Sequence, residues 1–249
     1  MNTHLSYLLR SLFPSRLYAY STKVRIPTST VDFRKLLVSK YLLKDGGSAI
    51  DGGAHIGYHT RYLSEIVGEK GEVWSFEPNP YMFKLLKKYA RQKKQISIFQ
   101  KALSDQTAHR VTFYVTPYSL LENSTLEEGL KEATQKKVEV ETIKIDDLPV
   151  SNLKLIKLDV EGHELSALAG AQNTISQFHP WIIFEYSHNK HRNGSPLLSF
   201  LKDLDYVCFD LETLDFLTPE ATIEITDAVA FPKDRKQEAI TFLKSLAYY

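Results

Sequence analysis

Short apolar runs alternate with longer amphipathic stretches along most of this chain. The apolar runs predict buried β-strands, and stretches with apolar residues three or four positions apart predict helices. Strands are expected near 48–52, 72–77, 96–99, 111–115, 138–145, 153–158, 181–185, 206–211 and 227–231. Helices are expected near 32–44, 56–67 and 197–204, after Pro80, around Leu165, and near 235–246. This alternation is typical of a doubly wound, mostly parallel α/β sheet with helices on both faces, ending in an antiparallel pair of strands.

The pattern is sharpest at residues 49–57, where an apolar approach ends in Asp51 and glycines follow. Gly52 and Gly53 allow a turn with positive φ and leave no side chain between the backbone and a ligand. Gly57 opens an amphipathic run and lets the new helix pack close to the strand before it. Such a strand–glycine–helix junction fits a nucleotide-like cofactor.

Two kinds of cofactor compete for this junction. The dinucleotide fingerprint needs glycines at its first, third and sixth positions, but the third position counted from Gly52 is Ala54. Asp51 would repel a pyrophosphate, whereas it suits the ammonium and sulfonium groups of S-adenosylmethionine (SAM). Glu77 ends the next strand and can accept hydrogen bonds from ribose hydroxyls in either case. Asp51 therefore favours SAM.

Four blocks, in order, carry a resemblance to a known family. They are residues 50–57 (IDGGAHIG), 76–80 (FEPNP), 102–105 (ALSD) and 157–164 (KLDVEGHE). Together with Leu168–Ala171 and Glu185, they resemble the FkbM-type SAM-dependent methyltransferases over roughly residues 45–190. His55 stands where the family often has Asn. The resemblance implies a class I, Rossmann-like fold with a seven-stranded sheet, to which the strand pattern adds a short β insertion before strand four.

Composition and charge limit the alternatives. The 249 residues suit one SAM-dependent methyltransferase domain at 31–249 after an extension at 1–30. Lys and Arg number 31 against 30 acids, so no overall field recruits nucleic acid. Cys208 is the single cysteine, which excludes an internal disulfide and a cysteine-based metal cluster and favours a cytoplasmic location.

The first twenty residues carry an apolar stripe with two arginines, but no apolar run is long enough to be a transmembrane segment. Packing of this stripe on the domain, or on a second subunit in a homodimer, is favoured over peripheral binding to a membrane.

The strand ends and the resemblance together give the expected cofactor site. In SAM enzymes of this architecture the adenine lies after the third strand, near Ser104 and Asp105. The expected cofactor-binding residues are Asp51, Gly52, Gly53, Ala54, His55, Gly57, Thr60, Glu77, Pro78, Ser104, Asp105 and Asp159.

Asp159 is expected to be the general base or the group that orients the acceptor, because it lies at a strand end in the cleft. Glu161 and His163 follow as catalytic candidates, although Glu161 and Glu164 also suit a helix N-terminus. The predicted acceptor contacts are Glu185 and His188 and, by family resemblance, Ser124 and Thr125. Glu185, His188 and His191 are weak evidence for a metal site, and no metal is predicted.

The sequence therefore predicts a methyltransferase that acts on a hydroxyl of a small-molecule or glycan acceptor. The resemblance favours O-methylation of a sugar or glycan, with a polyketide or other secondary metabolite as the alternative acceptor. Two alternatives of other classes remain: a nicotinamide-dependent (NAD) oxidoreductase and a non-catalytic SAM-binding module.

Overall fold

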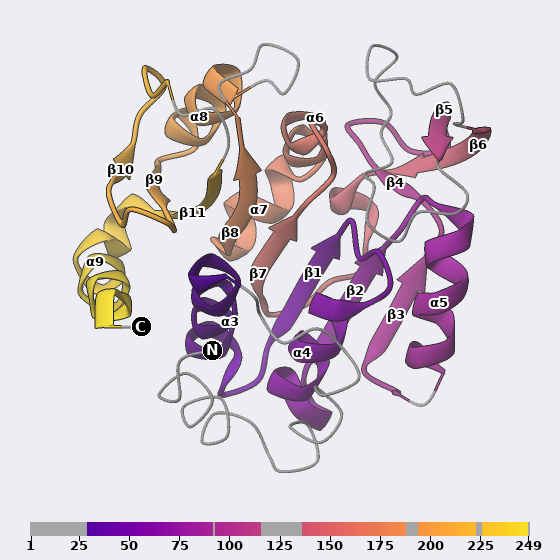
Figure 1. The fold of residues 1–249 in the computed structure, drawn as a ribbon, viewed down its shortest axis with the longest axis horizontal. Coiled ribbons are helices and arrows are strands. Elements are labelled where there is room, and N and C mark those ends of the chain that lie inside the picture. The colour runs from indigo at the N-terminus through magenta and orange to yellow at the C-terminus, as the bar shows by residue number, and fades with distance from the viewer. Residues whose placement is uncertain (1–28, 92, 116–135, 188–193, 223–225, 249) are drawn as a thin grey trace.

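The computed structural model describes residues 29–91, 93–115, 136–187, 194–222 and 226–248 (Figure 1). Most of the predicted extension at 1–30, the predicted acceptor residues Ser124, Thr125 and His188, and the metal candidate His191 lie outside these ranges. No helix in the described ranges has the length and apolar character needed to cross a membrane.

A central sheet of eight strands runs through the described part of the chain, in the order β10-β9-β11-β8-β7-β1-β2-β3 (Figure 1). Neighbouring strands from β3 to β8 pair in parallel, and β11 lies antiparallel between β8 and β9. The strands are β1 Ser48–Gly52, β2 Glu72–Phe76, β3 Ile96–Phe99, β7 Leu153–Leu158, β8 Trp181–Tyr186, β9 Tyr206–Asp210, β10 Phe216–Leu217 and β11 Thr226–Pro232. Seven of them form the predicted doubly wound arrangement, and the two-residue β10 adds an edge strand.

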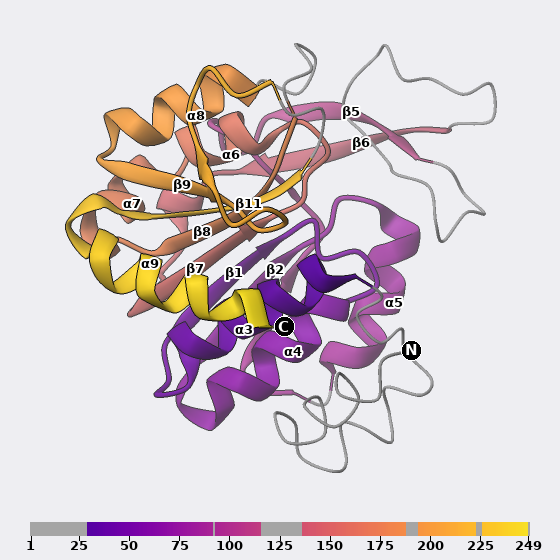
Figure 2. The ribbon, with the colours of Figure 1, turned by 60° about the vertical axis from the view of Figure 1, so that its left-hand side comes forward.

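Helices cover both faces of this sheet (Figure 2). One core contains apolar residues of α3, α4 and α9, and the other contains residues of α6, α7 and α8. Ala49 and Ile50, consecutive residues of β1, belong to opposite cores, because successive side chains of a strand point to opposite faces. The helices are α3 Thr30–Leu43, α4 Tyr58–Val67, α5 Pro80–Ala90, α6 Glu164–Ala169, α7 Gln172–Phe178, α8 Gly194–Asp203 and α9 Lys236–Ser245.

A small second sheet in the order β4-β6-β5 confirms the predicted β insertion before the fourth strand. Its strands are β4 Ala102–Leu103, β5 Arg110–Val115 and β6 Lys136–Ile143. Phe113, Val115 and Val140 are buried in its own small core. β6 ends two residues earlier than the sequence pattern predicts, because Ile145, which is buried, begins a 3-10 turn.

Candidate cofactor and active site

The glycine turn at Gly52 and Gly53 lies between the ends of β2 and β7. The amides of Gly53 and Ala54 donate to the Phe76 carbonyl at 3.0 and 2.9 Å, and the Asp159 amide donates to the Gly52 carbonyl at 3.0 Å. Gly53 has φ 71°, and a Cβ built on it would lie 1.8 Å from the Asp159 carbonyl oxygen. Since no real side chain tolerates that approach, glycine is required here by both backbone conformation and packing.

Asp51 is fully buried and has two polar neighbours. Thr60 Oγ1, on α4, donates to Asp51 Oδ2 at 2.6 Å and lies 3.0 Å from Ser75 Oγ. Lys157 Nζ lies 3.3 Å from Asp51 Oδ1 and 3.5 Å from Asp159 Oδ2. One buried lysine therefore lies between the carboxylate of Asp51, in β1, and that of Asp159, directly after β7.

This ion pair bears on two expectations about the cofactor site, those for Asp51 and Thr60. Asp51 was expected to offer its charge to a cationic ligand, and in the structure it shares one lysine, Lys157, with Asp159. Thr60 was expected to contact the cofactor, yet its side chain is fully buried and its hydroxyl is bonded to Asp51. Both residues therefore hold the turn from the interior of the protein.

The charges of Lys157 and Asp159 stabilise each other. Burial would lower the pKa of Lys157, but Asp51 and Asp159 outweigh it, so the pKa is raised and the lysine stays charged. Desolvation would raise the pKa of Asp159, but Lys157 and then Lys35 outweigh it and lower that pKa. The Asp159 side chain is 45% exposed while that of Lys157 is 5% exposed. Asp159 is thus an ionised carboxylate that an outside molecule can reach.

Glu77 is held at the end of β2 by two backbone amides. Its Oε2 accepts from the His55 amide at 2.6 Å, and its Oε1 accepts from the Asn79 amide at 2.7 Å. Burial raises the pKa of Glu77 to about 7, against the opposing effect of these two bonds. Because each carboxylate oxygen has two lone pairs, Glu77 keeps acceptor capacity for two further donors, as a ribose diol requires.

The N-terminus of α4 adds a complementary feature. Its N-cap is Gly57, with φ 91°, and in the described residues no side chain caps the helix and no acid lies in its first turn. Unpaired amides and the helix dipole favour a negative group here. Beside it, His55 adopts φ 51°, and burial lowers its pKa. A diol acceptor at Glu77 and an anion site at α4 together fit the ribose and the carboxylate of SAM.

Ser104 and Asp105, the residues predicted near the adenine, are fixed from α6. Ser166 Oγ lies 3.1 Å from Asp105 Oδ1 and 3.3 Å from Ser104 Oγ. Gly170 ends the same helix, and a Cβ there would lie 2.0 Å from the Ser104 carbonyl oxygen. The sequence blocks at 102–105 (ALSD) and 168–171 (LAGA) are therefore in direct contact.

The turn after Asp159 is tight and polar. Glu161 has φ 55° and Gly162 has φ 98°. Glu164 is buried and accepts from the Val160 amide at 3.1 Å, and burial raises its pKa to about 7. His163 Nδ1 has no hydrogen-bond partner among the described residues, and burial lowers the pKa of this imidazole. Asp159, Glu161 and His163 thus lie in one tight turn, which the bond from the Val160 amide to Glu164 braces.

Several residues of the site were not identified from the sequence. Lys157 is the most informative: of the two lysines in the apolar run LKLIKL, Lys154 is exposed, whereas Lys157 is buried and must be paired inside the protein. Lys35, which influences the pKa of Asp159 from α3, gives no comparable signal because charged and apolar residues are interspersed along that helix. Ser166 likewise is identified only from the structure, where it contacts Asp105, 61 positions earlier in the chain.

Known proteins give a family and several distant structural similarities. Residues 51–208 match the family described as Methyltransferase FkbM domain. No curated protein sequence matches the chain. An FkbM methyltransferase from Methylobacillus flagellatus KT is similar at 20% identity, 75% of this chain and 44% of that chain, with a TM-score of 0.47. The chain thus spans less than half of that protein.

Two further structures are similar over most of both chains. A SAM-dependent methyltransferase from Aquifex aeolicus shares 14% identity over 86% of this chain and 96% of that chain, with a TM-score of 0.48. A putative methyltransferase from Streptococcus mutans, in complex with SAH, shares 11% identity over 83% and 99%, with a TM-score of 0.47. Similarities this low say nothing about the substrate. The family match covers more than half of the chain, and this protein belongs to the FkbM methyltransferase domain family, whose cofactor is SAM.

Proposed function

We propose that this protein transfers a methyl group from SAM to a hydroxyl oxygen, and that the acceptor is a sugar or glycan. The observation that carries the proposal is the state of Asp159. It is ionised by Lys157, 45% exposed, and located at the carboxyl end of β7, beside the glycine turn. Ligands of open α/β sheets bind at this edge. A fixed carboxylate there suits an acceptor whose proton must leave as its oxygen becomes nucleophilic.

The described residues divide the binding of SAM among them. Glu77 would accept the ribose hydroxyls, the N-terminus of α4 would receive the carboxylate, and Ser104 and Asp105 would border the adenine. SAM supplies an activated methyl group on a sulfonium. Asp51 and Thr60 contribute indirectly, because they hold Lys157 and the glycine turn in place.

Asp159 orients the acceptor hydroxyl and takes its proton as the O–CH₃ bond forms and the S–CH₃ bond breaks, which leaves SAH as the other product. Alignment of the reactants is worth several kcal/mol when the reacting atoms are held in line. Orientation of the hydroxyl therefore contributes more to the rate than removal of its proton. The low pKa of Asp159 makes it a weak base, and His163, which burial keeps neutral, lies four residues away on the same turn as the alternative proton acceptor.

The test is methyl transfer from labelled SAM to a panel of glycosides, followed by the mass of the products. We expect a gain of one methyl group on oxygen, binding of S-adenosylhomocysteine (SAH) by calorimetry, and no change in NADH fluorescence. Asp159→Asn should lower turnover by about 100-fold, the lower end for a general base, while the Kd for SAH changes little. Full turnover in Asp159→Asn would remove this residue from the chemistry.

A further inference from the structure

A second buried lysine lies near the first. Lys35 projects from α3, and its Nζ lies 2.8 Å from Asp227 Oδ2 and 3.3 Å from Asp32 Oδ1. Its side chain is 8% exposed, whereas that of Asp227 is 29% exposed. A lysine is rarely buried unless it is paired, so this one is fixed by its carboxylate partners. The Lys35–Asp227 pair thus repeats the Lys157–Asp159 arrangement, in which a buried ammonium holds a carboxylate that remains accessible.

The sheet register places the two carboxylates at the same edge. Leu158 of β7 is paired with Phe184 of β8, and the next residue of β8, Glu185, is paired with Asp227 of β11. β11 runs antiparallel to β8, so its first residues lie where β7 and β8 end. Asp159 follows Leu158 directly. The three acids therefore form a row across three neighbouring strands, with Asp159 and Asp227 at its two ends.

The spacing of this row fits a ring with several hydroxyl groups. Neighbouring strands are about 4.8 Å apart, so two strand spacings separate the backbones of Asp159 and Asp227 by roughly 10 Å. Glu185 lies between these two positions in the register, so a sugar ring that bridges the end carboxylates through hydrogen bonds of about 2.7 Å lies over all three acids. Ionised carboxylates accept hydrogen bonds from hydroxyls and donate none, so both ends of the row select for a hydroxyl-rich molecule.

We propose that Asp227 binds a second hydroxyl group of the acceptor while Asp159 acts on the hydroxyl that is methylated, and that Lys35 is the positioning residue that holds Asp227. This inference rests on the proposed hydroxyl methylation. Without Lys35, Asp227 would lose its cation in a row of acids, and its carboxylate would turn away or take up a proton. The acceptor class is then a polyol, recognised through a hydroxyl group that does not react.

The experiment pairs protein variants with acceptor variants. Methyl glycosides of common hexoses, and their singly deoxygenated analogues, are offered to wild type, Asp227→Asn and Lys35→Met with labelled SAM. For wild type, removal of one particular non-reacting hydroxyl should raise KM by about tenfold, the scale of a hydrogen bond to a charged group. In both variants the parent glycoside should show that higher KM, and removal of the hydroxyl should raise KM no further. The value of kcat should change less than KM.

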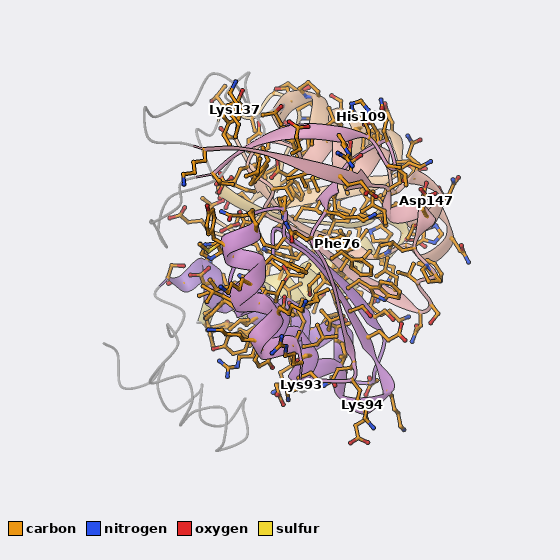
Figure 3. The ribbon with its side chains drawn as sticks, turned by 90° about the vertical axis from the view of Figure 1, so that its right-hand side faces the viewer. Phe76, Lys93, Lys94, His109, Lys137 and Asp147 are labelled. Carbon is orange, nitrogen blue, oxygen red and sulfur yellow. The ribbon has the colours of Figure 1, made fainter. Side chains whose placement is uncertain are left out.

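Two controls separate this role from a loss of folding. The Kd for SAH should remain within about twofold of wild type in both variants, because the cofactor residues lie on the other side of β7. Lys93→Met removes an exposed pair with Glu65, at the opposite end of the sheet from His109 and the small second sheet, and should change neither constant (Figure 3).

The remaining outcomes distinguish the two proposals. If wild type methylates a glycoside but no deoxy analogue is discriminated, or if Asp227→Asn retains the discrimination, the role of Asp227 and Lys35 is wrong and the proposed function stands. If wild type methylates a single-hydroxyl alcohol as readily as the glycosides, the polyol acceptor is wrong. If wild type with SAM methylates no compound of the panel and its SAH complex binds none of them, both proposals fail.

Discussion

Lys157 and Asp51 face each other across the β1–β7 pair, with Nζ 3.3 Å from Oδ1, and both side chains are buried. The same ammonium lies 3.5 Å from Asp159 Oδ2, on the exposed side. The lysine therefore links an interior carboxylate, which holds the glycine turn, to an accessible one placed for chemistry. The two carboxylates and the one ammonium together leave one net negative charge for a cationic ligand.

Replacement of Lys157 by methionine should be strongly destabilising. The variant keeps most of the side-chain volume but leaves Asp51 buried without its cation, and loss of one partner of a buried pair costs about 3–5 kcal/mol. The free energy of unfolding in urea measures this effect. Lys93→Met removes an exposed pair and should cost about 0–1 kcal/mol. Equal losses of stability in the two variants would show that the buried Lys157 pair contributes no more than an exposed pair.

The fold was largely predictable because hydrophobic periodicity and glycine positions are local signals. The strands that carry Asp51, Glu77, Asp159 and Glu185 all occur where the sequence indicates them. Sequence spacing also identified the acids at strand ends, since a short apolar run has a definite end.

The internal partners of those acids were less predictable, because they depend on contacts between distant segments. Thr60 is nine positions from Asp51, and its role is to orient that carboxylate. Lys35 meets Asp227 across 192 positions, and nothing local marks either residue. The electrostatic argument from Asp51 was incomplete for this reason, because it counted the carboxylate and missed Lys157, the residue paired with Asp51 on the neighbouring strand β7.

Cofactor affinity should depend on pH through Glu77. Burial raises its pKa to about 7, so below pH 7 the side chain becomes a carboxylic acid, which has one acceptor oxygen fewer for the ribose diol. The Kd for SAH should therefore rise by up to about tenfold per pH unit below about pH 7 and level off above it. Calorimetry across this range measures the dependence. Glu77→Gln should bind about tenfold more weakly at pH 8 and show a flat profile; a pH slope that persists in this variant would assign the titration to another group.

Glu164 should destabilise the protein at high pH. Its folded pKa of about 7 lies above the ordinary 4.5, so the folded state holds a proton that the unfolded chain releases, and stability falls as pH rises between these values. Glu164→Gln keeps an oxygen for the Val160 amide and avoids the buried charge. Its Tm should exceed that of wild type by about 2–4 °C at pH 8, with most of the gain lost at pH 5. Glu141→Gln is the matched control, because Lys101 lowers the pKa of that exposed carboxylate, and it should give no gain. A lower Tm for Glu164→Gln at pH 8 would mean that the ionised form is stabilised by the turn.

Alanine substitutions at Gly53 and Gly68 distinguish the cost of backbone strain from the cost of close packing. Both have positive φ, 71° and 62°, but a Cβ at Gly53 would lie 1.8 Å from the Asp159 carbonyl oxygen, whereas at Gly68 nothing lies within 4 Å. Gly68→Ala should cost about 1–3 kcal/mol of stability and leave SAH binding unchanged. Gly53→Ala bears the same strain and must also push the turn away from β7, which displaces the amides that bond to Phe76 and the segment that leads to α4. We expect its affinity for SAH to fall by at least tenfold and its turnover to fall further, because Asp159 moves with the turn. Calorimetry and urea unfolding of both variants measure the difference, and wild-type SAH affinity in a folded Gly53→Ala protein would show that the cofactor does not depend on this contact.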